Sequence, residues 1–305
     1  MIKLGPDDLN RMNWYGAKRA VAKLLALPGV NQLVQFAARK MLPADIAQRL
    51  PLARSSAIYR LESGDELKLN DPIHDIVARD IHWGGAKPTS PAEARKLICI
   101  ERLAHKATVF LDVGAYGGVC ALIAAHSNPR LHAIVYEIVP ENYLLVIRNI
   151  VTNNLAARVE AKLLGIGAGP EVLRLPAAMK LASFATSISL GSSFEHGIDI
   201  RVVSLDQETA AMSGPFLMKI DVEGYEQQVF DGGVEFIRKH RPDIICEVLT
   251  DAGEACLAIE RQLAPLGYRY FAFKKRGTIE ADHIAPDAVP RDWLFSARDD
   301  IESFL

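Results

Sequence analysis

The stretch that decides the fold is Val109–Val119, VFLDVGAYGGV. An apolar run that contains Asp112 is followed by three closely spaced glycines, which predicts a strand and then a tight turn into a helix. A dinucleotide fingerprint, G-x-G-x-x-G, needs a second glycine so that the backbone can approach a pyrophosphate. Tyr116 stands at that position. The pattern therefore predicts a ligand other than a dinucleotide, bound at the carboxyl edge of a sheet.

From residue 108 onwards, short apolar runs alternate with segments of helical spacing. Fully apolar strands that alternate with helices are typical of a parallel sheet covered on both faces, and so of an α/β fold. The predicted strands are 108–113, 131–137, 159–165, 171–175, 198–205, 216–221, 243–248, 268–273 and 293–297. The predicted helices are 91–105, 119–127, 141–153, 225–230 and 255–266, the first with Ser90 and Glu93 in capping-box spacing.

The segment before residue 91 has a different pattern. Two helices are predicted between Asn13 and Leu42, with a break at Pro28-Gly29. Residues 62–71, ESGDELKLND, resemble a hairpin, and residues 82–91 resemble a loop. We therefore expect an N-terminal helical extension with an irregular lead-in over residues 1–90, and an α/β domain over residues 91–305.

Two carboxylates mark the predicted ligand site. Asp112 precedes the glycine turn, and Glu137 ends the next predicted strand. A carboxylate at the second strand end suits a ribose, because it accepts two hydrogen bonds from a diol, and Asp112 suits an ammonium group, directly or through water. A diol and an ammonium without a phosphate describe S-adenosylmethionine. The structural alternative is that Asp112 caps the following turn and Glu137 is a solvated strand end.

A second charged group lies in residues 216–226, FLMKIDVEGYE. If the strand persists, Lys219, Asp221 and Glu223 share one face, because side chains alternate with a period of two. Glu247 lies at the end of the strand predicted at 243–248. Clustered carboxylates of this kind either act as a general base for a hydroxyl acceptor or hold a divalent metal ion. The alternative is a structural ion-pair lattice in which Lys219 neutralises Asp221 or Glu247.

Together these motifs resemble the FkbM family of S-adenosylmethionine-dependent methyltransferases. The resemblance covers roughly Val109 to Leu249, and the block KIDVEG at 219–224 is its most specific part. The motifs occur in the order of the family: FLDVGAYGG (110–118), VYEIVPEN (135–142), RNIVTNN (148–154), LLGIGAG (163–169), VVSLDQ (202–207), LMKIDVEGYEQQVFDGG (217–233) and IICEVL (244–249).

The resemblance implies a class I methyltransferase fold, with a Rossmann-like, mostly parallel seven-stranded sheet in the order 3-2-1-4-5-7-6 and the last strand antiparallel. It implies an O-methyltransferase that acts on a hydroxyl of a sugar, a glycolipid or another small natural product. The catalytic candidates are Asp221, Glu223, Glu247 and Lys219. The residues implied for S-adenosylmethionine binding are Asp112, Gly114, Ala115, Tyr116, Gly117, Glu137, Ile138 and Asp221.

The chain departs from the family pattern at two positions on the cofactor side. Tyr116 stands where the family commonly has asparagine, and Ile138 stands where proline is common. The phenol of Tyr116 would either crowd the pocket or cover the methionine portion of the cofactor. A pocket filled by Tyr116 would favour a second function, a catalytically inactive methyltransferase-like module that binds a partner through its basic N-terminal helices. A nicotinamide oxidoreductase is the third candidate, and the missing middle glycine argues against it.

Composition indicates a globular protein of a reducing compartment. The chain has 305 residues, of which 50% are hydrophobic and 24% charged, and its four cysteines form no C-x-x-C pair. No apolar run approaches the roughly 18 residues of a membrane-spanning helix. Lys18, Arg19 and Lys23 interrupt the first apolar patch, where a signal peptide would need an apolar centre. We expect a cytoplasmic location.

The net charge of −2 is unevenly distributed. Residues 1–60 hold ten Lys/Arg and three Asp, a net charge of +7, so the remainder carries −9. A basic helical arm contacts a membrane surface or an acidic partner, or it packs on the main domain with its lysines solvated. Because the surplus is confined to this arm, no nucleic-acid partner is expected. We expect acceptor specificity or oligomer contacts to lie in the segment before Val109.

Overall fold

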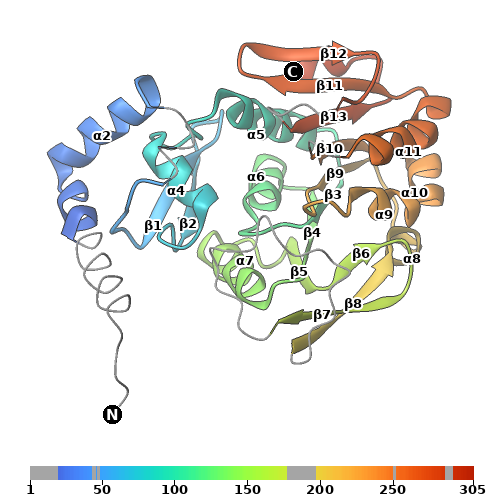
Figure 1. Cartoon of the computed structure of the whole chain (residues 1–305), viewed down its shortest axis with the longest axis horizontal. Coiled ribbons are helices and arrows are strands. Elements are labelled where there is room, and N and C mark those ends of the chain that lie inside the picture. The colour runs from blue at the N-terminus through green and yellow to red at the C-terminus, as the bar shows by residue number, and fades with distance from the viewer. Residues whose placement is uncertain (1–19, 43–45, 47–48, 177–196, 250–251, 286–290) are drawn as a thin grey trace. The chain divides into compact units, whose positions relative to one another are not determined.

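The chain folds into two compact units (Figure 1). The computed structural model describes residues 20–42, 46, 49–176, 197–249, 252–285 and 291–305. One unit comprises Met1–Arg60 and Lys68–Thr89, and the other comprises Leu61–Leu67 and Ser90–Leu305. The helix predicted from Asn13 lies outside the described residues as far as residue 19. None of the described helices is both long and apolar enough to cross a bilayer.

Among its described residues, the first unit has two helical segments before a hairpin, whose residues 61–67 are assigned to the second unit. Residues 20–25 are helical, helix α2 spans Pro28–Lys40, and strands β1 (Ser56–Arg60) and β2 (Glu66–Asn70) form a two-stranded sheet. The hairpin predicted at 62–71 is confirmed in part, because these residues hold the turn and β2 while β1 lies before them. The predicted helix break is two residues too late, because proline is favoured in the first turn of a helix, where its missing N–H needs no partner. Pro28 therefore starts α2.

Helix α4 (Ile76–Trp83) was not predicted, and the start of the loop predicted at 82–91 belongs to it. Asp75 caps its first turn by accepting a hydrogen bond from the Ala78 amide at 2.9 Å. Trp83 is fully buried and packs with Ala38 and Leu52 in a small core. This core gives the first unit an apolar centre of its own.

The second unit is built on an eight-stranded sheet. Neighbouring strands are parallel from β5 to β10, β13 is antiparallel to β10, and β11 is antiparallel to β13. The spatial order is β12 (Gly277–Ala281), β11 (Arg269–Lys274), β13 (Asp292–Ser296), β10 (Asp243–Glu247), β9 (Phe216–Ile220), β3 (Val109–Val113), β4 (His132–Glu137) and β5 (Val159–Leu163). From β5 to β11 this is the order 3-2-1-4-5-7-6 of a class I methyltransferase, with the last strand antiparallel as predicted.

The eighth strand, β12, is an addition to the predicted seven. It pairs with β11 at the edge of the sheet. Its sequence, GTIEA, is largely exposed and lacks the apolar run that identifies a buried strand. An edge strand of this kind leaves little signal in the sequence.

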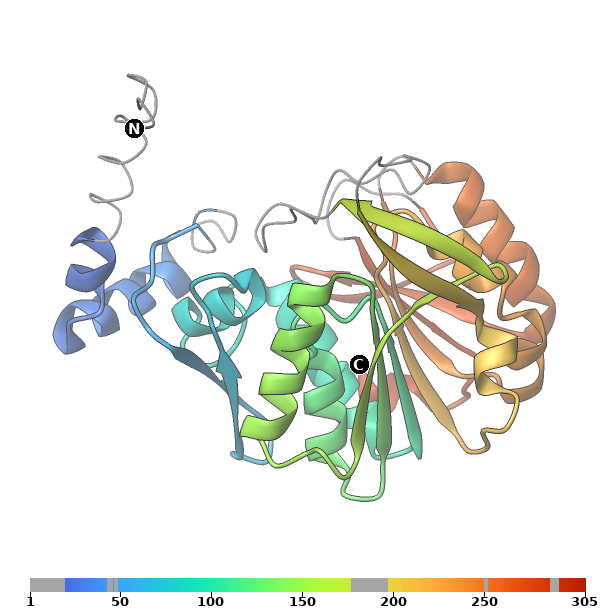
Figure 2. The ribbon, with the colours of Figure 1, turned by 90° about the horizontal axis from the view of Figure 1, so that it is seen from below.

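Helices cover both faces of the sheet (Figure 2). One layer holds α5 (Pro91–Ala104), α6 (Val119–Ser127) and α7 (Pro140–Thr152), and the other holds α8 (Leu205–Thr209), α9 (Glu226–Asp231), α10 (Val234–His240) and α11 (Gly253–Leu263). Helix α5 begins after Ser90, whose hydroxyl accepts a hydrogen bond from the Glu93 amide as the capping-box spacing predicted. The short helices α8 and α10 were not predicted.

The chain leaves the main sheet after β5. Strands β6 (Gly165–Gly167), β8 (Gly197–Ser204) and β7 (Glu171–Pro176) form a separate three-stranded sheet in that order. The strand predicted at 159–165 is therefore two pieces, because the glycines at 165 and 167 belong to the smaller sheet. Residues 177–196, between the strands predicted at 171–175 and 198–205, lie outside the described residues.

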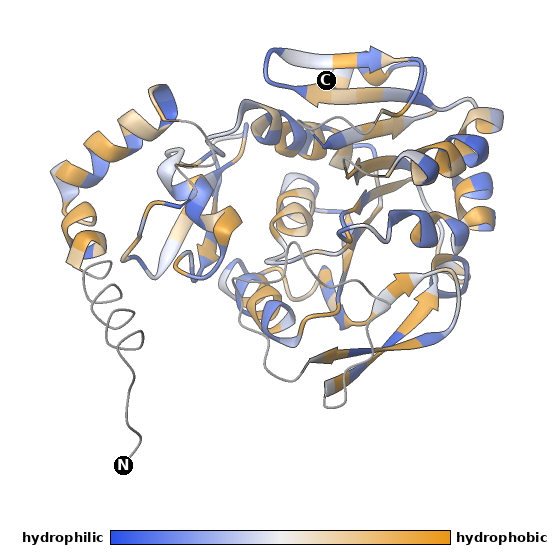
Figure 3. Ribbon diagram, in the orientation of Figure 1, coloured by the Kyte–Doolittle hydropathy of each residue, from blue (hydrophilic) through white to orange (hydrophobic). Residues whose placement is uncertain are grey.

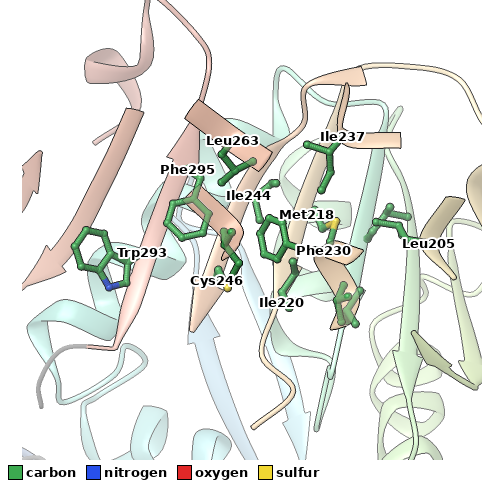
Figure 4. Packing of buried hydrophobic residues seen from close by; sticks show 14 of the residues in the cluster. Leu205, Met218, Ile220, Phe230, Ile237, Ile244, Cys246, Leu263, Trp293 and Phe295 are labelled. Atoms are coloured by element: carbon green, nitrogen blue, oxygen red, sulfur yellow. The ribbon is translucent and has the colours of Figure 1, made fainter. Parts of the chain in front are cut away.

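A large hydrophobic core lies between the sheet and the layer of α8–α11 (Figure 4). Met218 and Ile220 of β9 and Cys246 of β10 point into it, together with Phe230 and Leu263 from the helices. Because strand side chains alternate, the neighbouring Lys219 and Ile245 face the opposite layer. This alternation places the charged residues of β9 and β10 on the α5 and α6 side of the sheet.

Candidate active site

The ends of β3 and β9 meet at Gly114. Asp112 and Lys219 are partners in the parallel register of these strands. Two residues further on, Gly114 has φ 75°, and a Cβ atom built on it would lie 1.9 Å from the backbone oxygen of Asp221. Only glycine fits this approach. The contact brings the glycine turn and the acidic strand end, two motifs about 100 residues apart in the sequence, into one site.

Lys219 connects the two sides of this site. Its Nζ donates a hydrogen bond to the Gly114 carbonyl at 2.6 Å, and it lies 3.3 Å from Asp221 Oδ2 and 3.7 Å from Asp112 Oδ1. Burial lowers the pKa of Lys219, but Asp221 and Asp112 outweigh burial and raise it overall, so the ammonium stays charged. The ion pair between Lys219 and Asp221 that was considered as an alternative is therefore present, alongside the carboxylate cluster.

Asp112 is buried below the glycine turn. Its Oδ2 accepts a hydrogen bond from the Ala121 amide in the first turn of α6, at 3.2 Å. Burial raises its pKa, and Lys219 opposes the rise. The capping role proposed as the structural alternative is thus realised for Asp112. Its Oδ1 accepts no hydrogen bond from the described residues.

Glu137 holds the glycine turn and is 5% exposed, so it is not a solvated strand end. Its Oε2 accepts the Tyr116 amide at 2.7 Å, its Oε1 accepts the Val139 amide at 2.8 Å, and Asn142 adds a side-chain hydrogen bond. Burial raises the pKa of Glu137 to about 7 in spite of these donors. A carboxylate has about four acceptor positions, so roughly one is left for a ligand hydroxyl, fewer than the two that were expected.

The rest of the turn is fixed through its backbone. The amides of Gly114 and Ala115 both point to the Tyr136 carbonyl, at 3.0 and 3.3 Å. The Gly117 carbonyl accepts a hydrogen bond from Asn149 Nδ2 at 2.8 Å, and Asn149 is completely buried in α7. The turn is therefore rigidly built before any ligand binds.

The two positions that depart from the family pattern differ in their surroundings. Tyr116 is half-buried and has φ 53°, a left-handed conformation that is uncommon outside glycine. This conformation directs its amide to Glu137. Ile138 packs against Leu175 and Ile200 of the smaller sheet.

Three carboxylates gather across from the glycine turn. Oxygens of Asp221, Glu223 and Glu247 lie within 4.8 Å of one another. The reason predicted for Glu223 is wrong, because β9 ends at Ile220 and strand alternation does not reach residue 223. A turn places it instead: Glu223 has φ 54°, and Glu226 Oε1 accepts the amides on both sides of it, from residues 222 and 224, each at 3.1 Å.

The cluster keeps at least one proton near neutral pH, because burial and Asp221 also raise the pKa of Glu223 to about 7. Burial raises the pKa of Glu247 to about 9, and repulsion from Asp221 and from Asp292, its direct cross-strand partner, adds to the rise. Burial also raises the pKa of Asp221, but Lys219 and Lys96 outweigh it and lower the pKa overall. Asp221 is then ionised and hydrogen-bonded to a protonated Glu247. Such a pair can accept a proton, and the three carboxylates also have the chemistry of a divalent-cation site.

A family comparison agrees with this arrangement. The model of the Methyltransferase FkbM domain matches residues 112–270, just over half of the chain. The chain belongs to the FkbM methyltransferase family. The matched region runs from β3 into β11 and contains the glycine turn, Glu137, Lys219, Asp221 and Glu247.

Solved structures resemble this FkbM family member only distantly. Methyltransferase FkbM from Methylobacillus flagellatus KT is 16% identical with a TM-score of 0.42, over 72% of this chain and 53% of that one. The chain thus spans about half the length of that protein. The O-methyltransferase from Bacillus cereus, in complex with SAH, is 14% identical with a TM-score of 0.40, over 68% and 82%. TomG from Streptomyces achromogenes, an O-methyltransferase involved in tomaymycin synthesis and in complex with SAM, is 11% identical with a TM-score of 0.39, over 67% and 79%. Comparison with curated proteins gives no significant match.

The FkbM site contains residues that the sequence analysis missed. Lys96 of α5 is buried, and its Nζ lies 2.7 Å from Glu93 and 2.9 Å from Asp292 of β13. Lys96 lowers the pKa of Asp221, and Asp292 raises the pKa of Glu247, so both bias the charge of the carboxylate cluster. Lys96 and Asp292 are 196 residues apart, and neither lies in a recognisable motif. The only signal was a lysine in an otherwise apolar stretch of helix, KLICI at 96–100.

Proposed function

We propose that the chain is an S-adenosylmethionine-dependent methyltransferase that methylates a hydroxyl of a sugar, a glycolipid or another small natural product. The observation that carries the proposal is the contact between Gly114 and Asp221. It joins the glycine turn of the family and its carboxylates at one rim of the sheet, where open α/β folds bind ligands. A methyl donor on one side and an acceptor hydroxyl on the other would then be neighbours.

The residues on the turn side fit S-adenosylmethionine. Glu137 retains an acceptor position for a ribose hydroxyl. Asp112 Oδ1 is a buried oxygen without a hydrogen-bond donor among the described residues, which suits an ammonium or a water that bridges to one. The cofactor, when bound, supplies a methyl group activated by a positive sulfonium.

Asp221 is the proposed base. It is ionised, and its side chain is partly exposed while its neighbour Lys219 is buried. A hydroxyl oxygen becomes strongly acidic as it gains a methyl group, so a carboxylate with an ordinary or lowered pKa can take its proton. Glu247, protonated near neutral pH, and Glu223 orient this carboxylate. Much of the rate would come from holding two reactants together, an effect worth up to about 7–11 kcal/mol.

The same three carboxylates also fit a metal ion, and this is the second role proposed for them. Lys219, at 3.3 Å from Asp221, and Arg291, at 3.9 Å from Glu247, already bring positive charge to the cluster. We therefore expect turnover to survive EDTA. Activity that is lost in EDTA and restored by added Mg²⁺ would assign the cluster to a metal site instead.

A Glu137→Gln substitution is expected to weaken binding of S-adenosylhomocysteine about 10- to 100-fold, because the amide replaces one acceptor oxygen by a donor. The wild-type affinity should itself depend on pH. The pKa of Glu137 is raised to about 7, so the carboxylate is lost as the pH falls below 7, and affinity should fall with it. Calorimetric titrations between pH 6 and 8 check both points. The variant should lose the pH dependence, and unchanged affinity in Glu137→Gln would remove Glu137 from the cofactor site.

Thermal unfolding in the presence of S-adenosylhomocysteine tests whether the chain binds the cofactor at all. A ligand at about 100 times its dissociation constant adds about 2.7 kcal/mol of stability, which is a readily measured increase in Tm. No increase at millimolar ligand would favour the inactive binding module. A Tyr116→Asn variant separates the two readings of Tyr116, because binding that appears only in this variant would mean that the phenol blocks the pocket.

A further inference from the structure

Large apolar side chains are unusually exposed in one segment of the first unit. Leu33 and Met41 are 71% and 75% exposed. Side chains of this size are normally buried, and a cluster of them on a surface marks an interaction site. The exposed members between residues 21 and 46 are Val21, Leu24, Leu27, Leu33, Phe36, Met41 and Ile46.

On α2 these side chains occupy a face of their own. Leu33, Phe36 and Lys40 are spaced by three and four residues, so they lie on one side of the helix. Asn31 and Ala38, the buried residues of α2, lie on the opposite side, toward the core of the first unit. Figure 3 shows the hydrophobic stretches on this helix and on the helical turn before it. The exposed face is therefore additional to the face that the unit needs for its own packing.

The charge of the same region is positive. Residues 20–42 contain three Lys/Arg and no Asp or Glu, a net charge of +3. Lys23 and Lys40 are both exposed. Lys23 precedes Leu24 in the sequence, and Lys40 lies on the same side of α2 as Leu33 and Phe36. Apolar side chains flanked by lysines are the pattern of a helix that lies in the interface of an anionic membrane.

We propose that residues 20–42 bind the surface of an anionic lipid bilayer. The apolar side chains would enter the boundary between headgroups and acyl chains, and the lysines would contact lipid phosphates and carboxylates. A second copy of the chain fits this face less well, because two positively charged segments would repel each other. An acidic protein would satisfy the lysines but not explain the exposed leucines. The residues involved lie outside the proposed active site, so the proposal stands or falls independently of methyl transfer.

Vesicle co-sedimentation of the full chain tests the proposal. Binding to vesicles of phosphatidylcholine and phosphatidylserine (7:3) should be at least tenfold stronger than to phosphatidylcholine alone. A double variant, Leu33→Ser with Phe36→Ser, should lower partitioning about 100-fold, because each apolar side chain left in water loses roughly tenfold. Lys23→Gln with Lys40→Gln should lower it about tenfold on the anionic vesicles only.

A matched control is available on α7, where Leu144 and Val151 are exposed to a similar degree. Leu144→Ser with Val151→Ser should leave vesicle binding unchanged, and far-ultraviolet circular dichroism should show that all variants are folded. The proposal is overturned if the chain binds neither vesicle, if it binds both equally, or if the α7 variant loses as much binding as the α2 variant. Concentration-dependent dimerisation without lipid that the α2 variant abolishes would also overturn it, in favour of a second copy.

Discussion

Asp221→Asn is expected to lower turnover by about 10³-fold while the affinity for S-adenosylhomocysteine changes by less than about twofold. General-base catalysis is typically worth 10²- to 10⁴-fold, and the amide has the shape of the carboxylate but cannot take the proton. The backbone of Asp221 contacts Gly114 and Val113 whatever its side chain. The glycine turn should therefore keep its geometry and its ligand.

The measurement uses methyl transfer from labelled S-adenosylmethionine to an acceptor found by mass spectrometry of candidate glycans and lipids. Asp282→Asn, an exposed aspartate after β12, is the matched control and should retain full turnover. The role given to Asp221 would be wrong if Asp221→Asn turned over at more than a tenth of the wild-type rate. A parallel loss of ligand affinity would instead make Asp221 a cofactor-binding residue.

The second large effect is expected from Lys219→Met. Asp112 is completely buried, and Lys219 is the cation beside it. Removing one partner of a buried ion pair leaves an uncompensated charge and typically costs about 3–5 kcal/mol. We expect the free energy of unfolding to fall by that amount in urea titrations, and the contact between β3 and β9 to loosen with it.

Two further variants make this result specific. Lys239→Met on α10 removes an exposed lysine and should change stability by less than about 0.5 kcal/mol. Asp112→Asn combined with Lys219→Met removes both charges and should recover part of the loss in stability, because no unpaired carboxylate is then left buried at residue 112. A loss below about 1 kcal/mol for Lys219→Met alone would show that the lysine is not what balances Asp112.

The arrangement of the main sheet could be predicted because most of its central strands are largely buried. Five apolar runs were predicted as strands and correspond to β3, β4, β9, β10 and β11. The resemblance to the family supplied the order of the strands in the sheet. The elements that the sequence did not predict are short. Helices α4, α8 and α10 span 5–8 residues, too few for an apolar period to show. The edge strand β12 is polar, and such a strand looks like a loop in the sequence.

Some residues of the candidate site could likewise be predicted from the sequence, and others could not. Asp221 and Glu247 were found because Asp221 directly follows a buried strand and Glu247 ends one, where a charge is unusual. Glu223 was named for the wrong reason, since its position depends on a turn that Glu226 holds. Lys96 and Asp292 could not be predicted, because tertiary packing of α5 on β13 brings them together. Nor did the sequence show that the Glu137 carboxylate already accepts hydrogen bonds from the amides of Tyr116 and Val139.

The proposed function requires that a nucleoside with a sulfur centre lie across the strand ends between Glu137 and Asp221. A crystal structure of the complex with S-adenosylhomocysteine tests it most directly. We expect a ribose hydroxyl within hydrogen-bonding distance of Glu137 and the sulfur turned toward the Asp221 carboxylate. A ligand bound elsewhere, or bound with its sulfur pointing away from residues 221–247, would contradict it.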